Sequence, residues 1–268
     1  MKPTLRYILI SIFTVIVLGY LIYSLMYFYA NEGEKVCTGF EIGMIDNEKI
    51  QLITQKDIAL LLEENNLNPI GKTIKDIRKE AIEATLLKNP MIKKAECFQT
   101  PSGYIYVKVL QRTPKFRVVG LGSYYMDTDR NLMPVSTNNS AYVPVVSGRI
   151  TVSMAKGKMF DFITYLEQNP FWNDQIEQIF VRNDQKIELV PRVGDAIIVL
   201  GKLDNYASKL EKLRKLYVNG FNVIGWNRYK IIDLQYKDQV VCTKIGPTPK
   251  KRIIEIVEKK DSVIASKL

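Results

Sequence analysis

The apolar positions of this chain begin with one unbroken run from Tyr7 to Ala30, which contains no charged residue. About 20 apolar residues in a helix cross the hydrocarbon core of a bilayer, so this run predicts a transmembrane helix. The alternative, a cleaved signal peptide, would have a shorter apolar core and a small-residue cleavage site. Lys2 and Arg6 precede the run. Because short basic segments stay cytoplasmic, we expect the chain after Ala30 to lie outside.

The next stretch, residues 36–114, has the pattern of a small α+β domain. Thr54 and Thr73 are each followed three residues later by an aspartate, which predicts two capped helices. Ile105, Val107 and Val109 occupy every second position of Tyr104 to Leu110 and predict one face of a strand. The expected strands are Val36 to Ile42, Met91 to Phe98 and Tyr104 to Leu110. The expected order is therefore strand, helix, helix, strand, strand.

Residues 115–245 are richer in strand patterns, and two amphipathic helices interrupt them. The expected strands are Ser123 to Met126, Val143 to Val146, Ile176 to Val181, Ile187 to Val190, Ala196 to Leu200, Tyr229 to Tyr236 and Gln239 to Ile245. The expected helices are Met159 to Leu166, ended by Asn169-Pro170, and Tyr206 to Tyr217, ended by Asn219-Gly220. We expect residues 246–268 to be a disordered basic tail. Within it, Ile253 to Val257 could be a docking motif, but we favour the interpretation that it has no function.

Several of these residues resemble a known family. Asn89-Pro90, Pro101-Ser102-Gly103, Ile105 to Val109 and Gln111 to Pro114 resemble the POTRA domain of the bacterial division proteins FtsQ and DivIB. The segment Ile231-Ile232-Asp233-Leu234-Gln235-Tyr236 resembles a signature near the end of the second domain of that family, although Gln235 stands where arginine is common. The resemblance follows the whole chain in order.

The resemblance and the patterns together define the expected fold class: α+β, with an N-terminal transmembrane helix, a small POTRA domain and a β-rich domain with two helices. The expected boundaries are a cytoplasmic tail 1–6, a transmembrane helix 7–30, a POTRA-like domain 36–114, an FtsQ-like β domain 115–245 and a tail 246–268. The resemblance implies a bitopic protein of the inner membrane, located at the division septum with most of its chain in the periplasm.

The resemblance also implies where partners bind. In the family, the edge of the last strand is used, which here would be Gln239 to Ile245. A strand that closes the chain has a neighbour on one side only, so its free backbone groups could pair with an incoming strand. The alternative is an interior strand that is merely buried. The candidate partner-binding residues are Gln235, Tyr236, Gln239, Val240, Val241, Cys242, Thr243 and Lys244.

Charge changes this picture little. The net charge is +10 and the pI is about 9.3, which in a cytoplasmic chain would suggest nucleic acid. Outside the membrane there is no nucleic acid to bind, so we expect at most weak attraction to anionic surfaces. The chain has no histidine and only three cysteines, Cys37, Cys97 and Cys242, far apart in sequence. We expect the cysteines to be buried apolar residues.

Two motifs could carry chemistry. Asp127-Thr128-Asp129-Arg130-Asn131 has three oxygen ligands at calcium-loop spacing, but Leu132 and Asn138 stand where a glycine and a glutamate are needed. We therefore expect a polar turn. Ser153-Met154-Ala155-Lys156 fits the Ser-x-x-Lys motif of penicillin-interacting enzymes, but no Lys-Thr-Gly accompanies it. We expect no catalysis, cofactor, metal or small-molecule substrate.

The most consistent interpretation is a division scaffold that binds FtsB-like and FtsL-like single-span proteins and other components of the division machinery. A second hypothesis is a POTRA-bearing chaperone or arm of a secretion or outer-membrane assembly system. A single POTRA domain after an inner-membrane helix argues against it, because assembly POTRA domains usually occur in series before a β-barrel. A wall-modifying enzyme is a third, weaker hypothesis.

Overall fold

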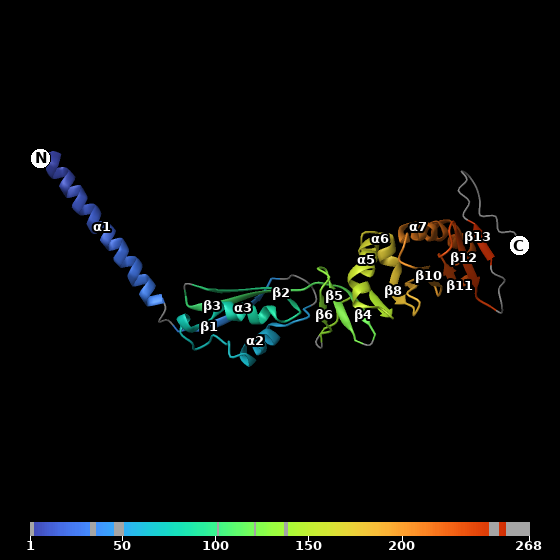
Figure 1. Ribbon diagram of the computed structural model, residues 1–268, viewed down its shortest axis with the longest axis horizontal. Helices are drawn as coiled ribbons and strands as arrows, with labels where there is room; N and C mark the ends of the chain where they lie inside the picture. Colours follow the sequence, from blue (N-terminus) through green and yellow to red (C-terminus); the bar gives the residue numbers. More distant parts are fainter. Residues whose placement is uncertain are drawn as a thin grey trace. The chain divides into compact units, whose positions relative to one another are not determined.

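The computed structural model describes residues 3–32, 36–45, 51–100, 102–120, 122–136, 139–246 and 252–255. Contacts divide the chain between Gln111 and Arg112 into two units (Figure 1). The expected division lay a few residues later, between Pro114 and Lys115. The expected α+β class is confirmed: an apolar N-terminal helix precedes a small mixed domain and a β-rich domain.

Helix α1 (Pro3–Glu32) contains the expected membrane span. Its segment Ile10–Tyr27 has a mean hydropathy of 2.0, and none of that segment is buried within the protein. Exposed apolar side chains over this length are stable in a bilayer and unfavourable in water. Helix α1 therefore fits a single-pass membrane anchor.

The first domain has the expected order of elements. They are β1 (Gly39–Met44), α2 (Gln55–Glu64), the 3₁₀ helix η1 (Ile74–Asp76), α3 (Lys79–Leu87), β2 (Ile92–Gln99) and β3 (Tyr104–Gln111). The sheet order is β1-β3-β2, with β1 parallel to β3 and β2 antiparallel to it. Ile105, Val107 and Val109 are at most 1% exposed, so the predicted face of β3 is confirmed. It packs against a core that includes Ile58 and Leu62 of α2 and Ile82 and Leu86 of α3.

Of the two predicted helix caps, the one at Thr54 is confirmed and the one at Thr73 is not. Thr54 caps α2 as expected: its hydroxyl accepts the Asp57 N–H at 3.2 Å, and Asp57 Oδ2 accepts the Thr54 N–H at 2.9 Å. The prediction that Thr73 caps an α-helix is wrong. Thr73 precedes η1, and Ile77 takes up extended angles (φ −80°, ψ 109°) that interrupt the helix before α3 begins at Lys79.

This difference gives a matched pair of variants. Thr54→Ala removes an acceptor of a helix N–H and should lower the stability of the first domain by about 1 kcal/mol. Thr73→Ala, which caps no α-helix, should cost clearly less, and Thr54→Ser should restore most of the loss. Chemical denaturation followed by far-UV circular dichroism measures the three values. Equal losses for the two alanine variants would contradict a capping role for Thr54.

The second domain is built on one sheet with the order β13-β12-β11-β10-β9-β8-β7-β4-β5-β6. Its strands are β4 (Pro114–Val119), β5 (Tyr124–Asp127), β6 (Leu132–Pro134), β7 (Val145–Gly148), β8 (Ile176–Val181), β9 (Ile187–Pro191), β10 (Ile197–Gly201), β11 (Tyr229–Asp233), β12 (Gln239–Lys244) and β13 (Arg252–Glu255). The pairs β4–β7, β7–β8 and β10–β11 are parallel, and the other neighbours are antiparallel. Strands β4, β6 and β13 were not predicted from the sequence.

The helices of this domain cover one face of the sheet (Figure 1). They are α4 (Val152–Met154), α5 (Phe160–Glu167), α6 (Pro170–Gln175), α7 (Tyr206–Leu216) and α8 (Asn222–Ile224), with π-helical turns at Ala155–Met159 and Tyr217–Phe221. The two expected helices are α5 and α7. Pro170 ends the first as expected and also starts α6, where a missing N–H is harmless. Gly220 does not end α7: helical turns continue to Ile224, and Gly225 at φ 87° ends them.

A buried carboxylate fixes the turn between β5 and β6. Asp127 is fully buried, and its Oδ1 accepts the N–H groups of Asp129 at 2.8 Å and Asn131 at 2.6 Å. Its Oδ2 lies 2.8 Å from a guanidinium nitrogen of Arg112. Burial by itself would raise the pKa of Asp127, but these N–H donors and the guanidinium more than offset it and hold the pKa below its ordinary value. The expected polar turn is present, and it is an organised core element.

The end of the chain differs from the expectation. Gln239 to Ile245 is not the last strand, because β13 pairs antiparallel with β12 on the side away from β11. Residues 252–255 of the expected disordered tail therefore form a strand, and the remainder of the tail after Glu255 lies outside the described residues. The physical reason is the unpaired edge itself, which offers backbone groups to any nearby extended segment.

Candidate partner-binding edge

The candidate site is the end of the second domain's sheet. Strand β11 pairs in parallel with β10 and antiparallel with β12, and Ile232 lies opposite Cys242. Along β12 the side chains alternate: Val240 and Cys242 belong to the core that α7 covers, whereas Val241 lies outside that core cluster. The strand is thus anchored to the domain through every second side chain.

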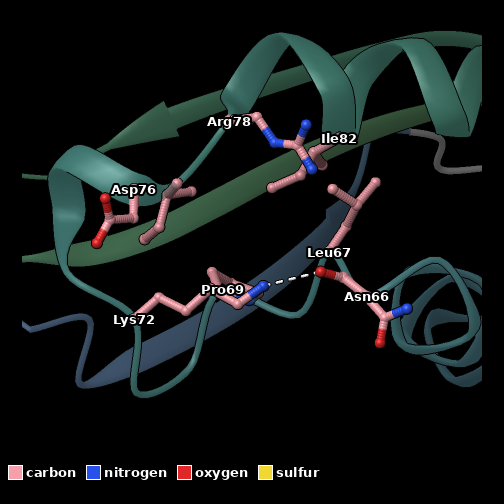
Figure 2. Close-up of a pocket in the computed structure, with 8 residues that line it drawn as sticks. Asn66, Leu67, Pro69, Lys72, Asp76, Arg78 and Ile82 are labelled. Atoms are coloured by element: carbon pink, nitrogen blue, oxygen red, sulfur yellow. Dashed lines mark hydrogen bonds between the residues drawn. The ribbon is translucent and has the colours of Figure 1, made fainter.

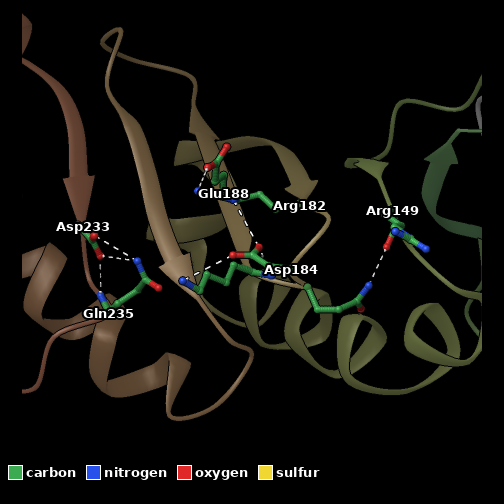
Figure 3. A network of polar contacts seen from close by, with 8 residues as sticks. Arg149, Arg182, Asp184, Glu188, Asp233 and Gln235 are labelled. Carbon is green, nitrogen blue, oxygen red and sulfur yellow. Dashed lines mark hydrogen bonds and ion pairs between the residues drawn. The ribbon is translucent and has the colours of Figure 1, made fainter.

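The turn between β11 and β12 is fixed from two sides. Asp233 Oδ1 accepts the backbone N–H of Gln235 at 2.9 Å and its side-chain amide at 3.1 Å (Figure 3). From α7, Lys212 Nζ donates to the carbonyl of Tyr236 at 2.7 Å. Burial lowers the pKa of Lys212, and the charge of Asp238 opposes that effect. These contacts hold Tyr236 at the corner, where its side chain is 41% exposed.

The structure brings the eight predicted residues together, with different degrees of exposure. Gln235 and Tyr236 are exposed in the turn, and Gln239, Thr243 and Lys244 are half-buried along β12. Val240, Val241 and Cys242 are buried. Since the side chains that anchor β12 are buried, a partner could meet the backbone groups and half-buried positions of this strand and the exposed residues of the turn. Sequence reasoning missed Lys212, which belongs to a distant helix, and β13.

The thiol of Cys242 is not a reactive group. It is 2% exposed, and burial raises its pKa to about 12. The thiol therefore stays protonated at neutral pH and behaves as a small apolar side chain. This agrees with the expectation for the cysteines as buried apolar residues, which Cys37 also meets and half-buried Cys97 meets only in part.

Another group of polar contacts in the second domain lies on the surface, in the β8–β9 hairpin. In the β8–β9 hairpin, Arg182 pairs with Asp184 at 3.4 Å and with Glu188 at 3.2 Å (Figure 3). The carbonyl of Arg149 accepts the amide of Gln185 at 3.3 Å. Exposed pairs of this kind add little stability and supply no reactive group. They hold the hairpin in register.

The first domain has a small hollow between the end of α2 and the start of α3 (Figure 2). Its volume is about 200 Å³, and Lys72 Nζ crosses one side to bond the carbonyl of Asn66 at 2.8 Å. Ligand pockets usually hold at least about 300 Å³ and are mostly apolar. This hollow, with Asp76 and Arg78 at its rim, does not fit such a site.

The enzyme motif is on the surface as well. Ser153 is exposed on α4, and Lys156 is exposed in the π-helical turn that follows. Within the described residues, no group of three or more His, Cys, Asp or Glu side chains could hold a metal ion. Among the candidate sites in the described part of the chain, the end of the sheet at β12 is therefore the best formed.

Comparison with known families agrees with this geometry. Residues 113–243 match the family model described as FtsQ/DivIB, C-terminal related, and residues 35–110 match the POTRA-like domain. No curated protein shows a significant match to the chain. The FtsQ/DivIB match ends within β12, so β13 lies beyond the part that this family model describes. With its apolar helix, POTRA-like domain and FtsQ-type β domain in this order, the chain belongs to the FtsQ/DivIB family.

Proposed function

We propose that the protein is a non-enzymatic, single-span scaffold of the bacterial division machinery. It binds FtsB-like and FtsL-like single-span proteins and links cytoplasmic ring assembly to septal cell-wall synthesis. The observation that carries the proposal is the presence of both family matches and one apolar helix in a single chain. Members of the FtsQ/DivIB family are in general non-enzymatic scaffolds of division, which supports this role.

The proposed binding site is the edge of β12 with the adjoining turn. Gln239, Thr243 and Lys244 are half-buried there, and Tyr236 offers an exposed ring of the type that anchors protein interfaces. A partner strand that pairs with β12 in place of β13 would gain main-chain hydrogen bonds, and the corner residues would add specificity. The buried residues Val240, Val241 and Cys242 would hold β12 in place, and exposed Gln235 would contact the partner from the turn.

Depletion and co-purification test the proposal together. Cells depleted of the protein should become filamentous, and the tagged protein should co-purify with single-span division proteins. Normal cell length after depletion, together with co-purification of outer-membrane assembly proteins, would favour the secretion or assembly hypothesis instead.

In the proposed topology, the apolar helix spans the inner membrane, the N-terminus lies in the cytoplasm and the chain after Ala30 lies outside the cytoplasm. The basis is the pair Lys2 and Arg6 before the span. A reporter that is active only in the periplasm, fused after Leu268, should be active. Activity of a cytoplasm-only reporter at the same junction would reverse the assignment.

A scaffold does not need the serine of the Ser-x-x-Lys motif. We expect Ser153→Ala to restore division in depleted cells as well as the wild type does, because Ser153 is an exposed residue of a short helix. Cell length and protein level measure the result. Filamentous cells at normal protein level would support the enzyme hypothesis.

A further inference from the structure

We propose that β13 is an exchangeable strand. It occupies, within the same chain, the edge of β12 that a strand of another protein uses, and the strand that replaces it runs antiparallel to β12. The link to division rests on the function proposed above, whereas the exchange itself does not.

The pairing between β12 and β13 is short. It consists of Gln239 with Glu255, Val240 with Ile254, Val241 with Ile253 and Cys242 with Arg252. Among the residues that the structure describes, β13 has a neighbour on this side only, because it is the last strand in the order of the sheet. A strand held by so few pairs along one edge has a low free energy of local opening.

The connection to β13 also allows exchange. Gly246, at φ 134°, follows β12, and the sequence then continues through Pro247, Thr248 and Pro249 before β13 begins. Prolines have no N–H to donate, so they do not extend a ladder of strand pairs. Strand β12 ends at Lys244 and β13 begins at Arg252, so the separation in sequence is longer than a tight two-residue hairpin turn, which would fix their register.

The two ends of the sheet differ in how they are protected. At the far end, β6 (Leu132–Pro134) is a very short strand that carries an exposed proline. Short strands and prolines are common ways to blunt an edge permanently. At the β12 end the cover is instead a separate strand, which can leave and expose a complete set of backbone donors and acceptors.

The register shows what kind of strand fits this edge. Two isoleucines, Ile253 and Ile254, stand opposite the two valines at the centre of β12, and a charged residue lies on each side of them. Pairs of β-branched residues across strands are favourable. We therefore assign to the partner an extended segment with two adjacent β-branched residues between charged ones.

Tethering makes β13 a competitor. Because β13 and β12 belong to the same chain and only a short segment separates them, the local concentration of β13 is on the order of millimolar. Suppose that β13 is detached from β12 in about a tenth of the molecules. An incoming strand then binds the full chain with an apparent Kd about tenfold higher than its Kd for a chain in which the β12 edge is always open. Removing β13 should therefore strengthen binding of a partner strand at least about tenfold.

The test uses the full chain in detergent micelles and a variant that ends at Gly246. The probe is a labelled peptide with the sequence of residues 250–258, and a scrambled peptide is the control. The shortened chain should bind the probe at least about tenfold more tightly than the full chain does. Hydrogen exchange should show alternate β12 amides losing protection on shortening and regaining it with the probe.

A second variant opens the same edge without shortening the chain, so the test does not depend on correct folding of the shortened form. Proline at both Ile253 and Ile254 should have the same effect as shortening, whereas Ala265→Pro, beyond β13, should behave as the wild type. Equal binding of the probe to all forms, or no binding to either open form, would overturn the proposal. Failure of an FtsB-like protein to bind an open form that binds the probe would count against the division role alone.

Discussion

Asp127→Asn should destabilise the second domain by about 3 kcal/mol, because it breaks a buried ion pair and leaves Arg112 without its carboxylate. The side chain of Asp127 is 1% exposed, and that of Arg112 is 23% exposed. The loss should appear in urea denaturation followed by tryptophan fluorescence, since Trp172 and Trp226 both belong to this domain. The matched control is Asp184→Asn, an exposed turn aspartate in the β8–β9 hairpin, which should leave the unfolding midpoint nearly unchanged.

The pH dependence gives a second readout of the same carboxylate. The folded pKa of Asp127 lies below its ordinary value of 3.8. Its contribution to stability is therefore complete above about pH 4 and is lost as the pH falls through the lower, folded pKa. The gap in stability between wild type and Asp127→Asn should stay constant from neutral pH to about pH 4 and shrink below it. A gap that closes already between pH 7 and pH 5 would contradict the assignment.

Proline at Val240 and proline at Val241 should have opposite effects. Successive N–H groups of a strand point to opposite sides, so one of these prolines removes a bond to β11 and the other a bond to β13. The first should destabilise the domain by about 2 kcal/mol or more, because it leaves a buried carbonyl unpaired and breaks the ladder. The second should leave the domain folded and abolish capture of the division partner.

Alanine at each position is the control that separates the side chain from the N–H group. Val240→Ala should cost stability, since this valine is fully buried in the core, and Val241→Ala, outside the core cluster, should cost less. Both alanine variants keep the N–H group and should still bind. Unfolding by both prolines to the same extent, or full binding by both, would exclude β12 as the binding edge.

Periodicity predicted the elements whose burial is regular. The alternation of Ile105, Val107 and Val109 placed β3 correctly, and the continuous apolar run gave α1. Cap chemistry was predictive at Thr54, because Thr54 and Asp57, three residues apart, accept each other's backbone N–H groups. At Thr73 the same pattern failed, because tertiary packing ends the local helix at Ile77.

The features that the sequence did not reveal depend on partners far along the chain. Nothing in Asp127 or Arg112 alone shows that the two meet in a buried pair, and the aspartate-rich turn therefore read as ordinary surface. Strand β13 was missed because its flanking residues are basic and proline-rich, a composition typical of tails. Its isoleucines belong to a strand that pairs with β12, a segment that is not recognisable from the tail sequence itself.

The most direct test of the account is site-specific photo-crosslinking in dividing cells. A photoreactive residue at Thr243, half-buried on β12, should crosslink to a single-span division protein, and the yield should rise when the chain ends at Gly246. The same residue at Pro134, on β6 at the opposite end of the sheet, should give no such product. Crosslinks to the division protein from Pro134 and none from Thr243 in either form would contradict partner binding at the β12 edge.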